Sequence, residues 1–114
     1  MAHTVLLVDD DPLVLETVAD MLADQGCEVV TATDGTEALA KLKAQPWIDV
    51  LITDITMPGL GGYELAEAAK RVKPDLPVTL LSGRETDRRG FPLIRKPFRE
   101  NELTRIMSRT AGLC

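Results

Sequence analysis

Short apolar runs alternate with longer segments of helical periodicity along the chain, and this alternation restricts the possible folds more than any other feature. Strands alternating with helices predict an α/β fold, in which helices cover both faces of a parallel sheet. The apolar runs predict strands at 4–9, 27–33, 49–54, 77–81 and 92–95. The periodic segments predict helices at 12–26, 35–45, 62–72 and 100–110.

The size and charge of the chain exclude several classes of protein. Its 114 residues suit one domain, 1–114, and its net charge of −5 without a long basic run disfavours nucleic-acid binding. Neither a stretch of about 20 apolar residues nor a secretory signal is visible. Cys27 and Cys114 lack a metal-binding spacing, so we expect a reduced, cytoplasmic protein without membrane contact, in which Cys27 is buried.

Acidic residues stand where two of the predicted strands end. Asp9 and Asp10 follow the first strand, and Asp54 ends the third. Ligand sites of parallel sheets lie beyond the carboxyl ends of the strands, so these acids converge if the two strands are neighbours. Three carboxylates in one cleft need a cation, and oxygen ligands favour Mg²⁺. Helix capping is the alternative for such acids, and we expect it for Asp11.

Further polar residues stand at the same predicted edge. The fourth strand leads to Ser82 and the fifth to Lys96, while the glycine-rich segment "ITMPGLGG" leaves Asp54 exposed. A hydroxyl donor, an ammonium group and a metal site together suit a phosphoryl group. The attacking group would be a carboxylate, which would form an aspartyl phosphate.

The motifs "LLVDDDP", "LITDITMPGLGG", "LLSG" and "IRKPF" occur in this order over essentially the whole chain. Together they resemble the receiver domain of bacterial two-component response regulators. The resemblance implies a flavodoxin-like (βα)₅ sandwich with strand order 2-1-3-4-5. It also implies that the chain is not a conventional enzyme, although it catalyses its own phosphorylation and dephosphorylation.

Roles for individual residues follow from the resemblance by position. Asp54 matches the phosphoacceptor, Asp9 and Asp10 match the acidic pair that holds Mg²⁺, and Thr56 matches a residue whose backbone carbonyl ligates the metal. Ser82 and Lys96, together with Asp54, make up the implied catalytic set.

The resemblance further implies that Gly83 gives the phosphate access, and that Thr56 and Arg84 tune the lifetime of the phosphorylated state. The implied phosphodonor is a sensor histidine kinase or a histidine phosphotransfer protein. A further protein would receive the signal, and the receiver would be a monomer or a weak homodimer.

The sequence departs from the family pattern in two places. Only the nine residues 83–91 lie between Ser82 and the fifth predicted strand, which is short for a parallel crossover. We therefore expect the fourth helix to be missing, replaced by a mobile loop. Leu93 stands where typical receivers have Tyr or Phe. A similarly short segment is found in some receivers associated with hybrid sensor kinases.

Other interpretations remain beside a stand-alone phosphorylated receiver. The chain could be an interaction module that works without phosphorylation, or a receiver fragment of a hybrid histidine kinase. A small aspartyl-phosphate phosphatase is less favoured, because position 56 is Thr where those enzymes carry a second acid. We expect Trp47 to serve packing rather than binding, and His3 to have no functional role.

Overall fold

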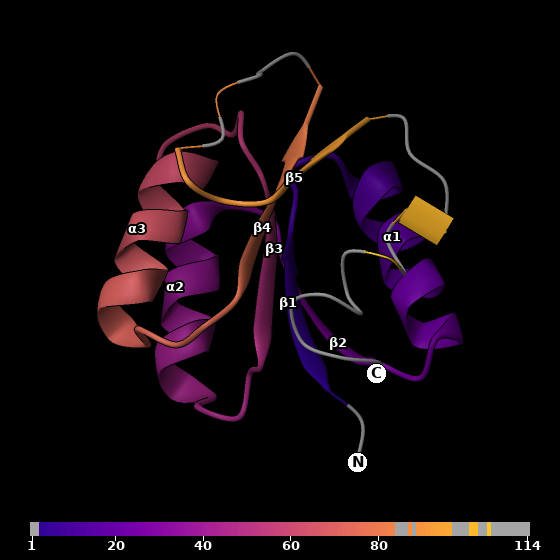
Figure 1. The fold of residues 1–114 in the computed structure, drawn as a ribbon, viewed down its shortest axis with the longest axis horizontal. Coiled ribbons are helices and arrows are strands. Elements are labelled where there is room, and N and C mark those ends of the chain that lie inside the picture. The colour runs from indigo at the N-terminus through magenta and orange to yellow at the C-terminus, as the bar shows by residue number, and fades with distance from the viewer. Residues whose placement is uncertain (1–2, 84–86, 88, 97–100, 103–104, 106–114) are drawn as a thin grey trace.

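The computed structural model describes residues 3–83, 87, 89–96, 101–102 and 105 (Figure 1). These residues include five strands and three helices in alternation. The strands are β1 (Thr4–Val8), β2 (Glu28–Ala32), β3 (Val50–Asp54), β4 (Val78–Ser82) and β5 (Leu93–Arg95). The helices are α1 (Pro12–Asp24), α2 (Gly35–Ala44) and α3 (Gly62–Val72).

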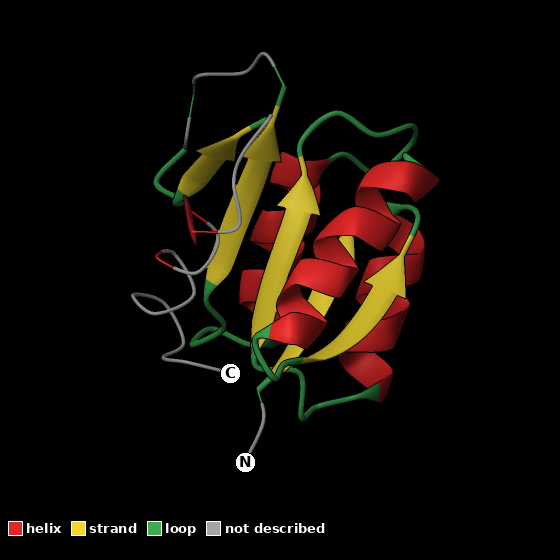
Figure 2. Ribbon diagram, turned by 90° about the vertical axis from the view of Figure 1, so that its right-hand side faces the viewer, coloured by secondary structure: helices red, strands yellow, loops and turns green. Residues whose placement is uncertain are grey.

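The five strands form one parallel sheet in the order β2-β1-β3-β4-β5 (Figure 2). Helix α1 covers one face of the sheet, and α2 and α3 cover the other (Figure 1). The predicted flavodoxin-like fold and its strand order are therefore confirmed. Because β1 lies beside β3, the residues that follow these two strands meet at one edge.

The side chains of β1 explain why helices cover both faces of the sheet. All five residues of the strand are buried. Leu6 and Val8 belong to the apolar cluster that contains the buried residues of α2 and α3. Val5 and Leu7 belong to the cluster on the other face, together with Val18 and Leu22 of α1. An apolar run without polar alternation thus becomes a strand that is buried on both faces.

The helices begin where the sequence predicts. Asp11 is the N-cap of α1, and its Oδ1 accepts a hydrogen bond of 2.9 Å from the backbone N–H of Leu13. Its capping role is therefore confirmed. Gly26, with φ 88°, follows the end of α1 in the left-handed conformation that glycine adopts readily. Asp34 caps α2 in the same way through the N–H of Glu37.

The connection between β4 and β5 is described only in part. Gly83, Asp87 and 89–91 contain no helix, which agrees with the expected loss of the fourth helix as far as these residues go. Residues 84–86 and 88 lie outside the described part of the chain. So does most of the predicted last helix, 100–110.

Two expectations about single side chains were wrong. Trp47 is 59% exposed in the turn between α2 and β3, because the neighbouring Ile48 fills the core position at that turn. Cys27 is buried as expected, but it is disulfide-bonded rather than reduced. Across the described residues, no helix is both long and apolar enough to cross a bilayer.

Candidate functional site

Three carboxylates converge at the carboxyl edge of the sheet. Asp9 follows β1, Asp10 comes next, and Asp54 is the last residue of β3. Each side chain offers an oxygen, and these oxygens lie within 4.8 Å of one another. Asp9 and Asp54 are buried whereas Asp10 is exposed, so the cluster opens to solvent on the side of Asp10. The convergence predicted from the strand ends is confirmed.

Lys96 brings a positive charge to this cluster from the end of β5. Its Nζ lies 2.9 Å from Oδ2 of Asp9 and 3.2 Å from Oδ1 of Asp54. The backbone N–H of Lys96 donates a hydrogen bond of 2.7 Å to the carbonyl of Ser82. The pairing of β5 with β4 therefore fixes the position of Lys96 along the sheet edge, and with it the contact of its ammonium group with the two carboxylates.

The electrostatics of the cluster shift two pKa values. Burial, followed by the nearby charge of Asp9, raises the pKa of Asp54 despite the ammonium group of Lys96 and the N–H of Ile55. Burial disfavours the charged form of Lys96, but its hydrogen bond to Asp9 and the charge of Asp54 outweigh burial and raise its pKa. Lys96 therefore stays charged, and Asp54 remains short of compensating positive charge.

The charges in the cluster fit a divalent cation. Among the described residues, three carboxylates face a single ammonium group, which leaves two negative charges uncompensated when all are ionised. Asp11 adds nothing here because its carboxylate caps α1. The donor set consists of oxygens only and has one exposed side, which suits a hard ion that keeps some of its water. Asp9, Asp10 and Asp54 are thus able to hold Mg²⁺.

Three further predicted site residues stand at or just after the carboxyl ends of β3 and β4. Ser82 is fully buried at the end of β4, and Thr56 is exposed two residues after Asp54. A Cβ added to Gly83 would meet no atom within 4 Å among the described residues, so the space beside Ser82 stays open. Arg84 lies outside the described residues.

A glycine whose role the sequence analysis missed shapes the segment after Asp54. The backbone N–H of Gly62 donates a hydrogen bond of 2.8 Å to the carbonyl of Ile55, which turns the chain back against the end of β3. A Cβ at Gly62 would lie 2.1 Å from the carbonyl oxygen of Asp54. Only glycine therefore fits at this position, and the "GG" of the sequence was the available signal.

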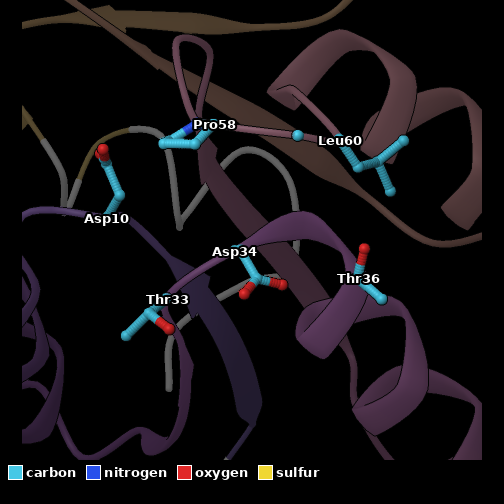
Figure 3. Close-up of a pocket in the computed structure, with 7 residues that line it drawn as sticks. Asp10, Thr33, Asp34, Thr36, Pro58 and Leu60 are labelled. Atoms are coloured by element: carbon cyan, nitrogen blue, oxygen red, sulfur yellow. The ribbon is translucent and has the colours of Figure 1, made fainter.

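A pocket of about 430 Å³ lies beside Asp10, where three loops of the carboxyl edge meet (Figure 3). The contribution of the loop between β2 and α2 was not anticipated from the sequence. The lining residues are Asp10, Thr33, Asp34, Thr36, Pro58, Gly59 and Leu60.

Comparison with known proteins places this arrangement in a family context. The model of the response regulator receiver domain matches residues 5–108. The nitrogen assimilation regulatory protein NtrX of Azorhizobium caulinodans is 37% identical over 96% of this chain and 26% of its own length. The probable transcriptional regulatory protein TcrX of Mycobacterium tuberculosis is 32% identical over 96% of this chain and 51% of its own length. The chain thus spans between a quarter and a half of these relatives.

Solved structures share the fold over nearly their full length. The chemotaxis protein CheY4 of Vibrio cholerae superposes with a TM-score of 0.89 at 31% identity, over 96% of this chain and 99% of that chain. The receiver domain of the hybrid histidine kinase CckA superposes with a TM-score of 0.84 at 33% identity, over 94% of this chain and 97% of that chain.

Proposed function

The chain belongs to the response regulator receiver domain family, and on this premise we propose that it accepts a phosphoryl group on Asp54. The observation that carries the proposal is the position of this carboxylate. It is buried at a strand end, 3.2 Å from the ammonium group of Lys96 and beside two further acids. A carboxylate held next to a positive charge and a cation site suits attack on phosphorus.

The residues that would hold Mg²⁺ are Asp9, Asp10 and Asp54, with the backbone carbonyl of Thr56 as a further ligand. When bound, Mg²⁺ would neutralise charge on the phosphoryl oxygens and on the acids. The buried carboxylates would then stay ionised in spite of their mutual repulsion.

The transfer step can be written for this chain. A carboxylate oxygen of Asp54 attacks the phosphorus of a phosphohistidine, and the bond between phosphorus and the imidazole nitrogen breaks with its electron pair left on nitrogen. The imidazole takes a proton, and Asp54 becomes a mixed anhydride. Lys96 donates hydrogen bonds to the phosphoryl oxygens, and Ser82 donates its hydroxyl to one of them. Water later hydrolyses the anhydride, so the chain is a self-modifying switch rather than a conventional enzyme.

The partners are proposals that rest on this chemistry. We expect the phosphodonor to be a sensor histidine kinase or a histidine phosphotransfer protein, and the output to be phosphorylation-dependent binding of another protein. We expect a cytoplasmic location, with residues 1–114 forming one receiver domain as a monomer or weak homodimer. Several relatives are named as transcriptional regulators, but this chain spans only part of their length.

A second candidate is a receiver that works as part of a hybrid histidine kinase. The likeness to the CckA receiver, 33% identical over 94% of this chain, favours it. The chemistry at Asp54 would be the same, and only the origin of the phosphoryl group would differ. Transfer from a separate kinase, compared with transfer within one polypeptide, would distinguish the two.

The test is treatment with acetyl phosphate and Mg²⁺ followed by intact-protein mass spectrometry. We expect one phosphoryl group on the wild type and none on Asp54→Asn. Asp75→Asn, which changes an exposed acid remote from the cluster, is the matched control and should be labelled normally. An unlabelled wild type, or a label that persists in Asp54→Asn, would contradict the proposal and would favour a module that works without phosphorylation.

A further inference from the structure

Arg89 joins the connection before β5 to helix α3 through several contacts at once. Its guanidinium lies over the ring of Tyr63, 4.0 Å from the ring centroid. Its Nη1 lies 3.6 Å from Oε1 of Glu67, one turn further along α3. The backbone N–H of Arg89 donates to Oδ1 of Asp87 at 3.0 Å, and the Tyr63 hydroxyl donates to the carbonyl of Asp87. We call these four residues the α3 clamp.

The backbone of the clamp is strained. Arg89 has φ 47°, and it is the one non-glycine residue with positive φ among the described residues. The left-handed conformation is unfavourable for a side chain with a Cβ, and it persists only where surrounding contacts hold it. The strain therefore indicates that the contacts of Arg89 with Tyr63, Glu67 and Asp87 exceed its cost.

Both ends of the clamp lead to the acid cluster through described residues. Tyr63 follows Gly62, which is hydrogen-bonded to Ile55 next to Asp54. Arg89 precedes the half-buried Phe91, and then β5 leads to Lys96. Figure 1 shows this segment passing beside the first turn of α3 before it enters β5.

Strand β5 needs such an anchor. It has three residues, lies at the edge of the sheet and, within the described part of the chain, pairs with β4 alone. The hydrogen bond from Leu80 to the carbonyl of Pro92, 2.8 Å long, marks where this pairing begins, and that from Lys96 to Ser82 marks where it ends. A strand this short gains little from its own ladder, and edge strands fray.

We propose that the α3 clamp anchors the entrance of β5 and thereby positions Lys96 against Asp54, which makes Tyr63 and Arg89 positioning residues for phosphoryl acceptance. The effect on phosphoryl acceptance rests on the proposed function. The anchoring of β5 by the α3 clamp does not depend on it. Isolated surface ion pairs contribute little. Here the ring and hydroxyl of Tyr63 and the carboxylate of Glu67 act together on Asp87 and Arg89, which are themselves joined by a hydrogen bond within the connection.

The structural part is tested by amide hydrogen exchange measured by NMR. In Tyr63→Ala and in Arg89→Gln, we expect the amides of Leu80 and Lys96 to exchange about two- to fivefold faster, the factor that corresponds to an exposed cation–π contact. The amide of Leu51, bonded to Pro77 in the centre of the sheet, should exchange as in the wild type. Arg71→Gln removes the same charge from an exposed site on α3 and should change none of them.

Conservative variants separate positioning from general destabilisation. Tyr63→Phe keeps the ring under Arg89 and loses only the hydroxyl, so it should restore most of the protection lost in Tyr63→Ala. The double variant Tyr63→Ala/Arg89→Gln should exchange more slowly than the sum of the two single effects predicts, because both changes remove the contact between the ring and the guanidinium. Unchanged exchange in both single variants, or fully additive effects, would overturn the clamp.

The chemical part uses the initial rate of labelling by acetyl phosphate with Mg²⁺. We expect a decrease of about two- to fivefold in Arg89→Gln and normal labelling in Arg71→Gln. Faster exchange with an unchanged labelling rate would overturn the positioning role. A wild type that is never labelled would instead overturn the proposed function and leave the exchange results to decide the clamp.

Discussion

At the scale of single residues, Thr79 is a weak point in the core. Its side chain is 1% exposed in β4, and its hydroxyl has no hydrogen-bond partner among the described residues. An unpaired buried hydroxyl costs about 1–3 kcal/mol. Thr79→Val removes the hydroxyl and keeps the shape, so we expect the free energy of unfolding to rise by about 1 kcal/mol in urea denaturation.

The matched control for this change is Thr53→Val in the neighbouring strand β3. Thr53 is equally buried, but its hydroxyl donates a hydrogen bond of 2.9 Å to the carbonyl of Asp54. Its replacement should lower the free energy of unfolding by about 1 kcal/mol. Equal effects of the same sign at the two positions would show that hydrogen bonding does not distinguish them.

The raised pKa of Asp54 predicts a stability that depends on pH. Burial and the charge of Asp9 raise this pKa above the ordinary value of 3.8, so the folded chain holds the proton more tightly than the unfolded chain. The stabilisation from that proton is present below pH 3.8 and is lost as the pH rises through the folded-state pKa. In metal-free buffer, Asp54→Asn should therefore gain stability over the wild type as the pH rises toward neutrality.

Thermal unfolding from pH 3.5 to 7.5, on the order of one unit per step, would measure this difference. The two proteins should have similar Tm values at the acid end and should diverge above it. A difference in Tm that stays constant with pH, or a higher Tm of the wild type at neutral pH without metal, would contradict the raised pKa of Asp54.

At the scale of elements, the start of α3 depends on Gly62. Helix propensity alone predicts that Gly62→Ala stabilises the chain by about 1 kcal/mol. The structure predicts the opposite, because the added Cβ would lie 2.1 Å from the carbonyl oxygen of Asp54. Overpacking against backbone should lower the free energy of unfolding by about 2–3 kcal/mol.

Gly83→Ala is the control in a denaturant titration. The added Cβ would meet no described atom within 4 Å, so the change should stay within about 0.5 kcal/mol. If Gly62→Ala were the more stable of the two variants, the close packing of α3 against β3 would be refuted.

The five strands and the helices α1, α2 and α3 were predicted to within one or two residues, whereas the predicted helix 100–110 lies mostly outside the described residues. β1 spans Thr4–Val8 where 4–9 was expected, and α3 matches its predicted range 62–72. Apolar runs and caps act locally, so they are readable along the chain. Trp47 was misplaced because its exposure depends on which neighbour in the turn fills the core, and local patterns carry no such information.

At the scale of the whole molecule, cation binding should be coupled to folding. Asp10 and Asp54 are 44 positions apart in the sequence and meet only in the folded sheet. A cation that binds only this cluster stabilises the entire fold, by about 2.7 kcal/mol at a hundredfold excess over its Kd. We therefore expect Mg²⁺ to raise the Tm of the wild type.

Variants of the adjacent residues Asp10 and Asp11 test whether the rise in Tm depends on the acid cluster. Asp10→Asn should reduce the Mg²⁺-dependent rise in Tm, because this carboxylate belongs to the cluster. Asp11→Asn has the same change in charge but should keep the full rise, because Asp11 caps α1 and Asn caps equally well. An equal loss in both variants would mean that the cation responds to overall charge and not to this site.

The sequence by itself determined the strands, the helices, their alternation and the acids at the strand ends, because each of these depends on residues close together in the chain. Tertiary structure alone decided that Lys96 lies between Asp9 and Asp54, that Gly62 fits against β3, and that Arg89 holds a strained backbone on Tyr63. These features are contacts between segments distant in sequence. They form only when the sheet brings its carboxyl edge together, and no local pattern of residues encodes their distances.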